Sequence, residues 1–270
     1  MLSAVAVAAL DAGAAWFEDF GAGGRGPGTV CGVFRHACYV RFPDRLAALC
    51  DAGVASGPLH LRLSSMPALE RGDRIEVHDG WLETRVEAIV VPPERRWAPP
   101  PVDPGALEEA ARRRSGEPAG GFGGAGDLEA AWDPEAAWKP DGRRWERLAE
   151  LVAAGDLVAL ARTVGGRGPG LTPAGDDFLA GVLVVDALRH PTRLAERRTA
   201  AGASVTTDVA AAFLRWAVLG QCIQPVHDVV AAVVSDDSAR EAQARSRLRG
   251  TGASSGAALL LGLDQALSVV

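Results

Sequence analysis

Lysine is almost absent from this chain of 270 residues: Lys139 is the only one, and arginine supplies the rest of the positive charge. A reaction that depends on lysine, such as Schiff-base chemistry or phosphate binding by a P-loop, therefore has a single candidate, which lies outside any motif. The formal net charge of −6 argues against nucleic acid or an anionic membrane as the main partner.

Cysteine and histidine are too few and too scattered to indicate a disulfide framework or a metal site. The four cysteines include no Cys-x-x-Cys pair, which predicts reduced, mostly buried thiols in a cytoplasmic protein. The five histidines have no ligand spacing. These residues are Cys31, Cys38, Cys50 and Cys222, and His36, His60, His78, His190 and His227.

Long hydrophobic runs are missing as well. No segment reaches the roughly 18 to 20 apolar residues that a membrane-spanning helix needs. Residues 1–17 are apolar, but they lack a positively charged start, and Asp11 interrupts them. They favour a first helix over residues 1–20 rather than a secretory signal peptide.

An alternation of apolar and polar residues, typical of β-strands, runs through residues 29–91. It is clear at Arg74–His78, and the dipeptide Asp79-Gly80 that follows predicts a hairpin. Residues 1–91 should therefore form a small antiparallel β domain, either a sandwich or a barrel, with the N-terminal helix before it. His60 occupies a polar position of this pattern, where we expect it to be exposed.

A proline-rich and a glycine-rich segment separate this region from the rest. Residues 92–127 are assigned as a linker that includes a short helix at Pro104–Arg114. Residues 128–270 are expected to be helical, because capping residues such as Thr206 or Thr207 precede apolar stretches of helical period. The expected fold class is therefore α+β, with a C-terminal α-helical bundle after the β domain.

The most informative segment is the glycine-rich turn Gly165–Asp177, which opens an apolar helix. Its glycines permit positive φ angles and let backbone amides approach a ligand closely. The helix start adds unpaired N–H groups and a partial positive charge. Together they predict a site for a phosphate or a carboxylate, to which Arg167 can add a bidentate contact. The segment has no Gly-Lys-Ser/Thr and no preceding strand, so it is neither a P-loop nor a Rossmann turn.

Two acids, Asp176 and Asp177, lie in the first turn of that helix. They suit the helix dipole but repel a nearby anion unless another group offsets their charge. A Mg²⁺ ion bridging carboxylate and phosphate would do so, and so would an ammonium or amide group of the substrate. A structural alternative is that Asp176 only caps the helix and the glycines only form a tight turn.

A second small-residue turn, Gly252–Gly256, also leads into an apolar helix. Gly256 and Gly262 are six residues apart, like Gly175 and Gly181 after the first turn. Two such helix starts could face each other across one site, with the adjacent serines of the second turn offering hydroxyl groups. The alternative is that these glycines only allow close helix packing.

The sequence Gly-Arg-Gly-Pro-Gly-Leu-Thr-Pro-Ala-Gly-Asp-Asp-Phe-Leu-Ala-Gly at 166–181 closely resembles the signature of the AllH-like family. One branch of this family is a subunit of oxamate carbamoyltransferase, which acts in allantoin and purine-nitrogen breakdown. The similarity extends over nearly the whole chain, from Val33–Ala37 and Gly57–Leu59 to Thr206–Gly220 and Gly250–Gly262.

The resemblance implies that the central motif lines the site. The family's second motif tends to read Gly-His-Ser/Thr-Ser-Gly with an acid shortly after it. This chain keeps that frame at Gly252–Gly256 but has Ala253, Ala257 and Ala258 where the histidine and the acid would stand. If relatives use those groups, this chain binds a different ligand or has lost a step. The lining residues of the central motif are Gly168, Gly170, Thr172, Gly175, Asp176 and Asp177.

Three functions remain open at this point. The first is carbamoyl transfer of the oxamate/oxalurate type, linked to carbamoyl phosphate, by a subunit that needs partner chains. The second is a non-catalytic subunit that binds a small carboxylate or a phosphorylated metabolite. The third is an oligomeric scaffold, because wide apolar helix faces suit an interface as well as a core. For the first, the catalytic residues would be Asp176, Asp177 and Thr172, and the ligand-binding residues would be Arg167, Gly168, Gly170, Gly175, Ser254, Ser255 and Gly256.

Overall fold

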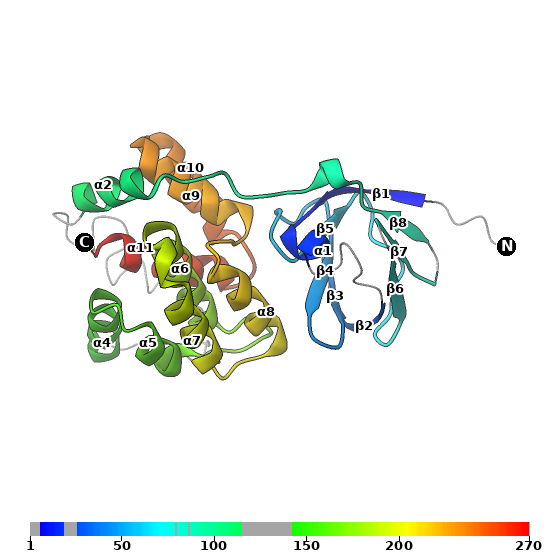
Figure 1. Cartoon of the computed structure of the whole chain (residues 1–270), viewed down its shortest axis with the longest axis horizontal. Coiled ribbons are helices and arrows are strands. Elements are labelled where there is room, and N and C mark those ends of the chain that lie inside the picture. The colour runs from blue at the N-terminus through cyan, green and yellow to red at the C-terminus, as the bar shows by residue number, and fades with distance from the viewer. Residues whose placement is uncertain (1–5, 19–25, 79, 86, 115–141, 270) are drawn as a thin grey trace. The chain divides into compact units, whose positions relative to one another are not determined.

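The computed structural model describes residues 6–18, 26–78, 80–85, 87–114 and 142–269. The chain forms two compact units that divide after Pro99, a β unit followed by a helical unit (Figure 1), so the α+β class is confirmed. The glycine-rich part of the expected linker, after Arg114, lies outside the described residues.

The β unit is a closed barrel with the strand order β1-β5-β4-β3-β2-β6-β7-β8. Not all of its pairings are antiparallel, because β1 pairs with β8, and β4 with β5, in the parallel direction. The prediction of an antiparallel sheet was wrong for these pairs, since alternation shows which face a residue occupies but not the direction of the neighbouring strand. The strands are β1 (Ala6–Ala12), β2 (Gly26–Val33), β3 (Ala37–Arg41), β4 (Leu46–Asp51), β5 (His60–Leu63), β6 (Arg74–His78), β7 (Trp81–Glu83) and β8 (Ala88–Val90).

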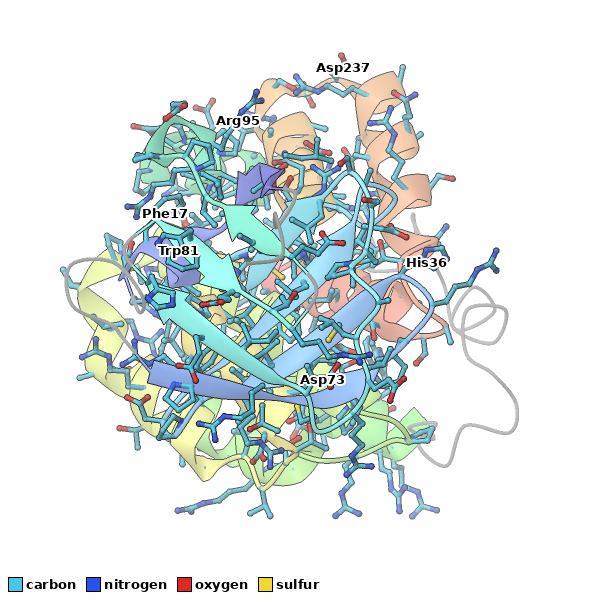
Figure 2. The ribbon with its side chains drawn as sticks, turned by 90° about the vertical axis from the view of Figure 1, so that its right-hand side faces the viewer. Phe17, His36, Asp73, Trp81, Arg95 and Asp237 are labelled. Carbon is cyan, nitrogen blue, oxygen red and sulfur yellow. The ribbon has the colours of Figure 1, made fainter. Side chains whose placement is uncertain are left out.

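The alternating residues of β6 behave as expected. Ile75 and Val77 are buried in the barrel core, whereas Arg74, which precedes them, is exposed and Glu76, which separates them, is half-buried. His78 pairs with Trp81 across the predicted hairpin, and the centroids of their stacked rings are 3.9 Å apart. Trp81 is labelled in Figure 2. The hairpin prediction is therefore confirmed.

The prediction of a first helix over residues 1–20 was wrong for its central part. Ala6–Ala12 forms strand β1, and among the residues of this range that the structure describes only Ala14–Glu18 is helical (α1). Pairing with β5 and β8 overrides the high helix propensity of alanine. His60 is also buried, not exposed, and its Nδ1 lies 2.8 Å from the carbonyl oxygen of Ala55.

The helical unit is built around α6, whose residues from Ala174 to Ala187 are all buried. Within the part of the chain that the structure describes, no helix is both long and apolar enough to cross a membrane. The expected helix at Pro104–Arg114 is present as α2, and it adds Leu107 and Ala110 to the core of this unit. The other helices are α4 (Gly142–Ala153), α5 (Leu157–Val164), α6 (Ala174–Arg189), α7 (Leu194–Ala203), α8 (Asp208–Ala217), α9 (Gln224–Ser235), α10 (Ser238–Arg249) and α11 (Ser255–Leu267).

Among the helices that the structure describes, α6 and α11 share the most extensive contact, and they are neighbours in Figure 1. Their backbones touch where each has a glycine. A Cβ atom on Gly181 would be 2.4 Å from the carbonyl oxygen of Leu259, and one on Gly262 would be 2.0 Å from that of Phe178. Close packing is therefore one role of these two glycines, and it brings the starts of both helices together.

Candidate functional site at the starts of two helices

The glycine-rich turn connects α5 to α6, and three of its glycines have positive φ angles: Gly166 at 67°, Gly168 at 113° and Gly170 at 90°. Residues other than glycine rarely adopt this backbone region. A Cβ atom on Gly175, in the first turn of α6, would be only 2.0 Å from the carbonyl oxygen of Val164. The glycines therefore fold the chain sharply back and seat the start of α6 against the end of α5.

Asp176 is 2% exposed, and both oxygens of its carboxylate accept hydrogen bonds. Oδ1 accepts from Ser204 Oγ at 2.7 Å, and Oδ2 accepts from the N–H of Gly166 at 3.0 Å and from Thr206 Oγ1 at 2.5 Å. Asp176 is not the helix cap, since the N-cap residue of α6 is Pro173. It ties the glycine-rich turn and the segment before α8 to the start of α6, which favours a positioning role.

Sequence reasoning missed Ser204 altogether and identified Thr206 and Thr207 only as candidate caps of α8. Thr207 does cap α8, and its hydroxyl group also donates to the carbonyl oxygen of Leu171 in the glycine-rich turn. The cluster of hydroxyl residues before α8 was the available signal, but nothing in the sequence shows that this segment faces the turn.

Asp177 is 9% exposed, and its Oδ2 atom is buried without a hydrogen-bond partner among the described residues. Ser255, at the start of α11, forms a hydrogen bond with the same carboxyl group. Burial, opposed by the Ser255 hydrogen bond and reinforced by the nearby Asp176, raises the pKa of Asp177 to about 7. Near neutral pH this group therefore exists in both protonation states, which suits a residue that exchanges hydrogen bonds or protons with a ligand.

The two small-residue turns meet at this carboxyl group. Thr172 Oγ1 and Ser255 Oγ are 2.9 Å apart, so a chain of hydrogen bonds runs from Thr172 through Ser255 to Asp177. The two hydroxyl residues are partly exposed, whereas Asp177 is buried. The structure thus brings three predicted site residues together. Thr172 and Ser255 connect the surface to the buried carboxyl group of Asp177.

The second turn is built like the first. A Cβ atom on Gly256 would be 1.7 Å from the carbonyl oxygen of Leu248, so this glycine seats α11 against the end of α10. Ser254 is the N-cap residue of α11, without a side-chain cap hydrogen bond. Of the two serines, it is Ser255 that reaches the carboxyl group of Asp177.

Arg167 is exposed, and its guanidinium group has no ion pair or hydrogen bond within the described residues. The backbone N–H groups of Gly168, Gly170 and Leu171 likewise have no acceptor in the described ranges. A guanidinium group and unbonded amides in one short turn are donors that an anion can use.

The described residues offer few oxygen ligands for the predicted magnesium site. No group of three or more His, Cys, Asp or Glu side chains that could hold a metal occurs in the described parts of the chain. The oxygens of Asp176 are occupied by protein donors, so only Oδ2 of Asp177 is unbonded. Cys222 is near enough for the charge of Asp177 to affect it, but burial raises the pKa of its thiol to about 12, which leaves it unreactive.

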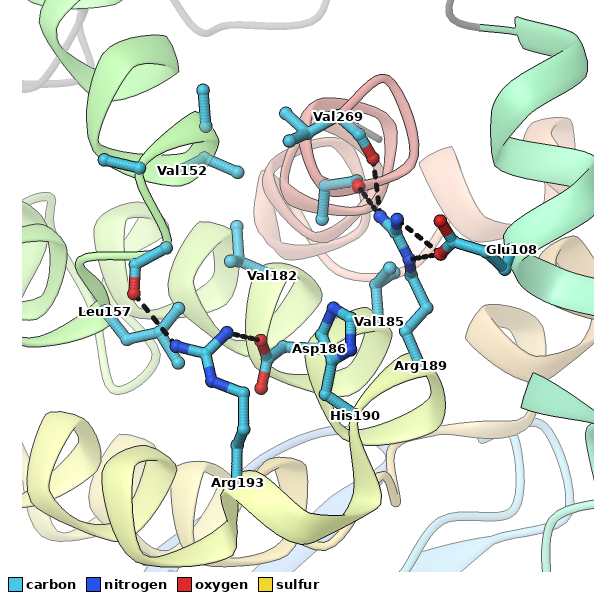
Figure 3. Close-up of a pocket in the computed structure, with 14 residues that line it drawn as sticks. Glu108, Val152, Leu157, Val182, Val185, Asp186, Arg189, His190, Arg193 and Val269 are labelled. Carbon is cyan, nitrogen blue, oxygen red and sulfur yellow. Dashed lines mark hydrogen bonds and ion pairs between the residues drawn. The ribbon is translucent and has the colours of Figure 1, made fainter. Parts of the chain in front are cut away.

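A cavity of about 300 Å³ lies toward the opposite end of α6, where the C-terminal ends of α4, α6 and α11 come together (Figure 3). Much of its wall is apolar. Its lining includes two acids, Glu108 and Asp186, and two arginines, Arg189 and Arg193. Asp186 is nine residues, or about 14 Å, along α6 from Asp177, so this cavity is separate from the glycine-rich turn.

Each of these four charged side chains has a partner. Arg189 donates to Glu108 at 2.7 Å and to two carbonyl oxygens at the end of α11 at 3.1 and 2.6 Å. Arg193 donates to Asp186 at 2.9 Å and to a carbonyl oxygen just after α4 at 3.1 Å. The arginines therefore satisfy helix C-terminal ends, and no unpaired charge among these four remains to select a ligand.

Comparison with known families supports the resemblance seen in the sequence. A family model described as oxamate carbamoyltransferase subunit AllH matches residues 164–267. The match begins at the last residue of α5 and ends at the last residue of α11, so it includes both turns and the Asp177 carboxyl group. A search of curated proteins and a search of solved structures give no match.

Proposed function

With residues 164–267 matched to the AllH family, we propose that this chain is a subunit of a carbamoyltransferase of the oxamate/oxalurate type. The ligand site lies at the N-terminal ends of α6 and α11, and partner subunits complete the enzyme. In the reaction the amide nitrogen of a small carboxylate loses a proton and forms a bond to the carbamoyl carbon of carbamoyl phosphate, whose bond to the phosphate oxygen breaks so that phosphate leaves; the reverse reaction returns the carbamoyl group to phosphate. Such a step needs an anion cradle and a group that orients a weakly nucleophilic nitrogen.

The observation that carries this proposal is the unpartnered, buried Oδ2 of Asp177 beside a turn with unpaired donors. Arg167 and the amides of Gly168 and Gly170 supply the anion cradle. Asp177 faces the reacting group, while Asp176 holds the turn in place through its three hydrogen bonds.

A thermal-shift screen of the purified chain tests the proposal with carbamoyl phosphate, phosphate, oxamate and oxalurate. A ligand at 100 times its Kd adds about 2.7 kcal/mol to the free energy of unfolding, which moves the midpoint by a few degrees. We expect carbamoyl phosphate to stabilise the wild type and the Arg162→Ala control, whose exposed arginine lies on α5 outside the turn. The shift should disappear in Arg167→Ala; equal shifts in both variants would place the anion elsewhere.

A non-catalytic binding subunit is the second candidate, and one feature favours it. Ala257 and Ala258 occupy the first turn of α11 at the positions that Asp176 and Asp177 occupy in α6, so the second turn supplies no acid. The two candidates differ in turnover by the assembled complex. Asp177→Ala should abolish turnover if the chain is catalytic, and unchanged turnover would leave only the binding role.

A further inference from the structure

The Oδ2 atom of Asp177 needs a hydrogen-bond donor that the described protein residues do not provide. A buried acceptor without a protein partner is costly, so a ligand that brings a donor to this atom gains a favourable contact. A carboxylate oxygen cannot be that donor because it only accepts hydrogen bonds, and a phosphate, although it keeps an O–H at neutral pH, carries charge that repels an ionised Asp177. An amide N–H fits both the charge and the geometry of a carboxylate acceptor.

We infer that Asp177 selects a primary amide by accepting its N–H on Oδ2, and that Ser255, held in turn by Thr172, orients the carboxyl group for this contact. The inference rests on the proposed function and deepens it by assigning the group that distinguishes an amide from a simple anion. The ligand class is a primary amide attached to an anionic group, with the anion on the Arg167 turn and the amide on Asp177.

The direction of the hydrogen bonds supports this assignment. When Asp177 is ionised, Ser255 must donate to it, and the oxygen of Ser255 is then free to accept from Thr172 at 2.9 Å. The chain of hydroxyl groups fixes one side of the carboxylate and leaves Oδ2 for the ligand. Ser255 and Thr172 are therefore positioning residues, and Asp177 is the residue in contact with the ligand.

The groups that titrate around Asp177 are few among the described residues. Asp176, on the same helix, has both oxygens occupied by protein donors, and Cys222, before α9, keeps its proton because its pKa is about 12. Because the ionised form of Asp177 is the stronger acceptor for the N–H, binding favours that form and should release part of a proton at neutral pH. The released fraction reports on Asp177 and not on its neighbours.

Oxamate and pyruvate form a matched pair of ligands, since they differ by an NH₂ group in place of a methyl group. We would measure their binding to the full chain by isothermal titration calorimetry at pH 7, in two buffers with different ionisation enthalpies. We expect oxamate to bind about ten- to a hundredfold more tightly than pyruvate, as a hydrogen bond to a charged group implies. Oxamate binding should release up to about half a proton per ligand, because the pKa of Asp177 is about 7 and the contact favours its ionised form.

Variants separate contact from positioning. Asp177→Leu, which has a similar size but no acceptor and no titrating group, should remove both the preference for oxamate and the proton release while inorganic phosphate still binds. Ser255→Ala removes a hydrogen bond that lowers the pKa of Asp177, so the rise of oxamate affinity with pH should move to higher pH. Ser255→Thr keeps the hydroxyl group and should restore the wild-type pH profile. A purely structural role for Ser255 would change stability but not this profile.

The outcomes distinguish the inference from the proposed function. Equal binding of oxamate and pyruvate by the wild type, with phosphate binding still lost in Arg167→Ala, overturns the amide contact and leaves the carbamoyltransferase proposal standing. Oxamate binding without proton release also overturns it. Failure of the wild type to bind phosphate, carbamoyl phosphate and oxamate overturns the proposed function, and the inference falls with it.

Discussion

The α6–α11 pair has opposite chemistry at its two ends. At the C-terminal end, Arg189 and Arg193 donate to the carboxylates of Glu108 and Asp186 and to backbone carbonyl groups at helix ends. All four charged side chains there are therefore paired. At the N-terminal end, Asp177 keeps an unbonded oxygen, and Arg167 has no ion pair within the described residues. Each end carries charge of the sign that its helix dipoles favour, so the difference lies in pairing rather than in charge.

This difference teaches that a well-formed cavity need not be the functional site. The space near Asp186 is about 300 Å³, yet its charged groups already satisfy one another and the helix ends. The turn at Asp177 has buried and exposed polar groups left over, and a folded chain tolerates such groups mainly where a ligand uses them. We therefore expect changes at the C-terminal end to alter stability alone, and changes at the N-terminal end to alter binding.

The largest expected effect is that of Asp186→Ala at the C-terminal end. Asp186 accepts from Arg193 and from Arg197, each at 2.9 Å, and Arg197 is only 2% exposed. Removing the acid leaves a buried charge without its partner, which should lower the free energy of unfolding by about 3–5 kcal/mol. Urea unfolding measures the loss, and ligand affinity measured well below the unfolding transition should be unchanged. A weakened ligand affinity would contradict the expectation that changes at the C-terminal end of the α6–α11 pair alter stability alone.

Asp176→Asn should have the next largest effect on stability. An amide nitrogen cannot accept the hydrogen bonds that one carboxylate oxygen receives, so a buried donor such as that of Ser204 or Thr206 loses its partner. We expect a loss of about 1–3 kcal/mol in the free energy of unfolding. Glu146→Gln, which changes an exposed acid on α4, is the matched control and should remain within about 0.5 kcal/mol of the wild type.

Asp177→Asn should stabilise the chain at alkaline pH, opposite in sign to its neighbour. The pKa of Asp177 is raised from 3.8 to about 7, so the folded state binds more protons than the unfolded state between these values. The free energy of unfolding therefore falls as the pH rises from about 4 to about 7, and the cost of burying the ionised carboxylate is fully present above pH 7. Asparagine avoids burying that charge and should gain on the order of 2 kcal/mol at pH 8 and little at pH 4. Urea unfolding at both pH values gives the comparison, and a loss of stability at pH 8 would contradict it.

The smallest effect on stability belongs to Arg167→Ala. The guanidinium group is exposed and unpaired within the described chain, so the free energy of unfolding should change by less than about 0.5 kcal/mol. Stabilisation by carbamoyl phosphate should nevertheless be lost, which thermal shift would detect. Substantial destabilisation without ligand would show that Arg167 supports the fold rather than the anion.

Several local features followed from the sequence because short-range chemistry fixes them. The glycine-rich turn, the helix it opens and the hairpin of β6 and β7 depend on residues a few positions apart. The N-terminal strand could not be found in this way. The residues of β1 favour a helix by local propensity, and only pairing with β5 and β8, far along the chain, makes them a strand.

The sequence by itself determined that two acids stand at the mouth of a buried helix and that Thr172, Ser255 and Asp177 belong to two similar turns. It could not decide that both carboxylate oxygens of Asp176 accept hydrogen bonds from the protein while one oxygen of Asp177 accepts none. That distinction depends on Ser204 and Thr206 approaching one acid, and on Ser255 leaving an oxygen of the other unbonded. Adjacent residues on a helix point about 100° apart, so identical side chains enter different surroundings that only the packing of distant segments creates.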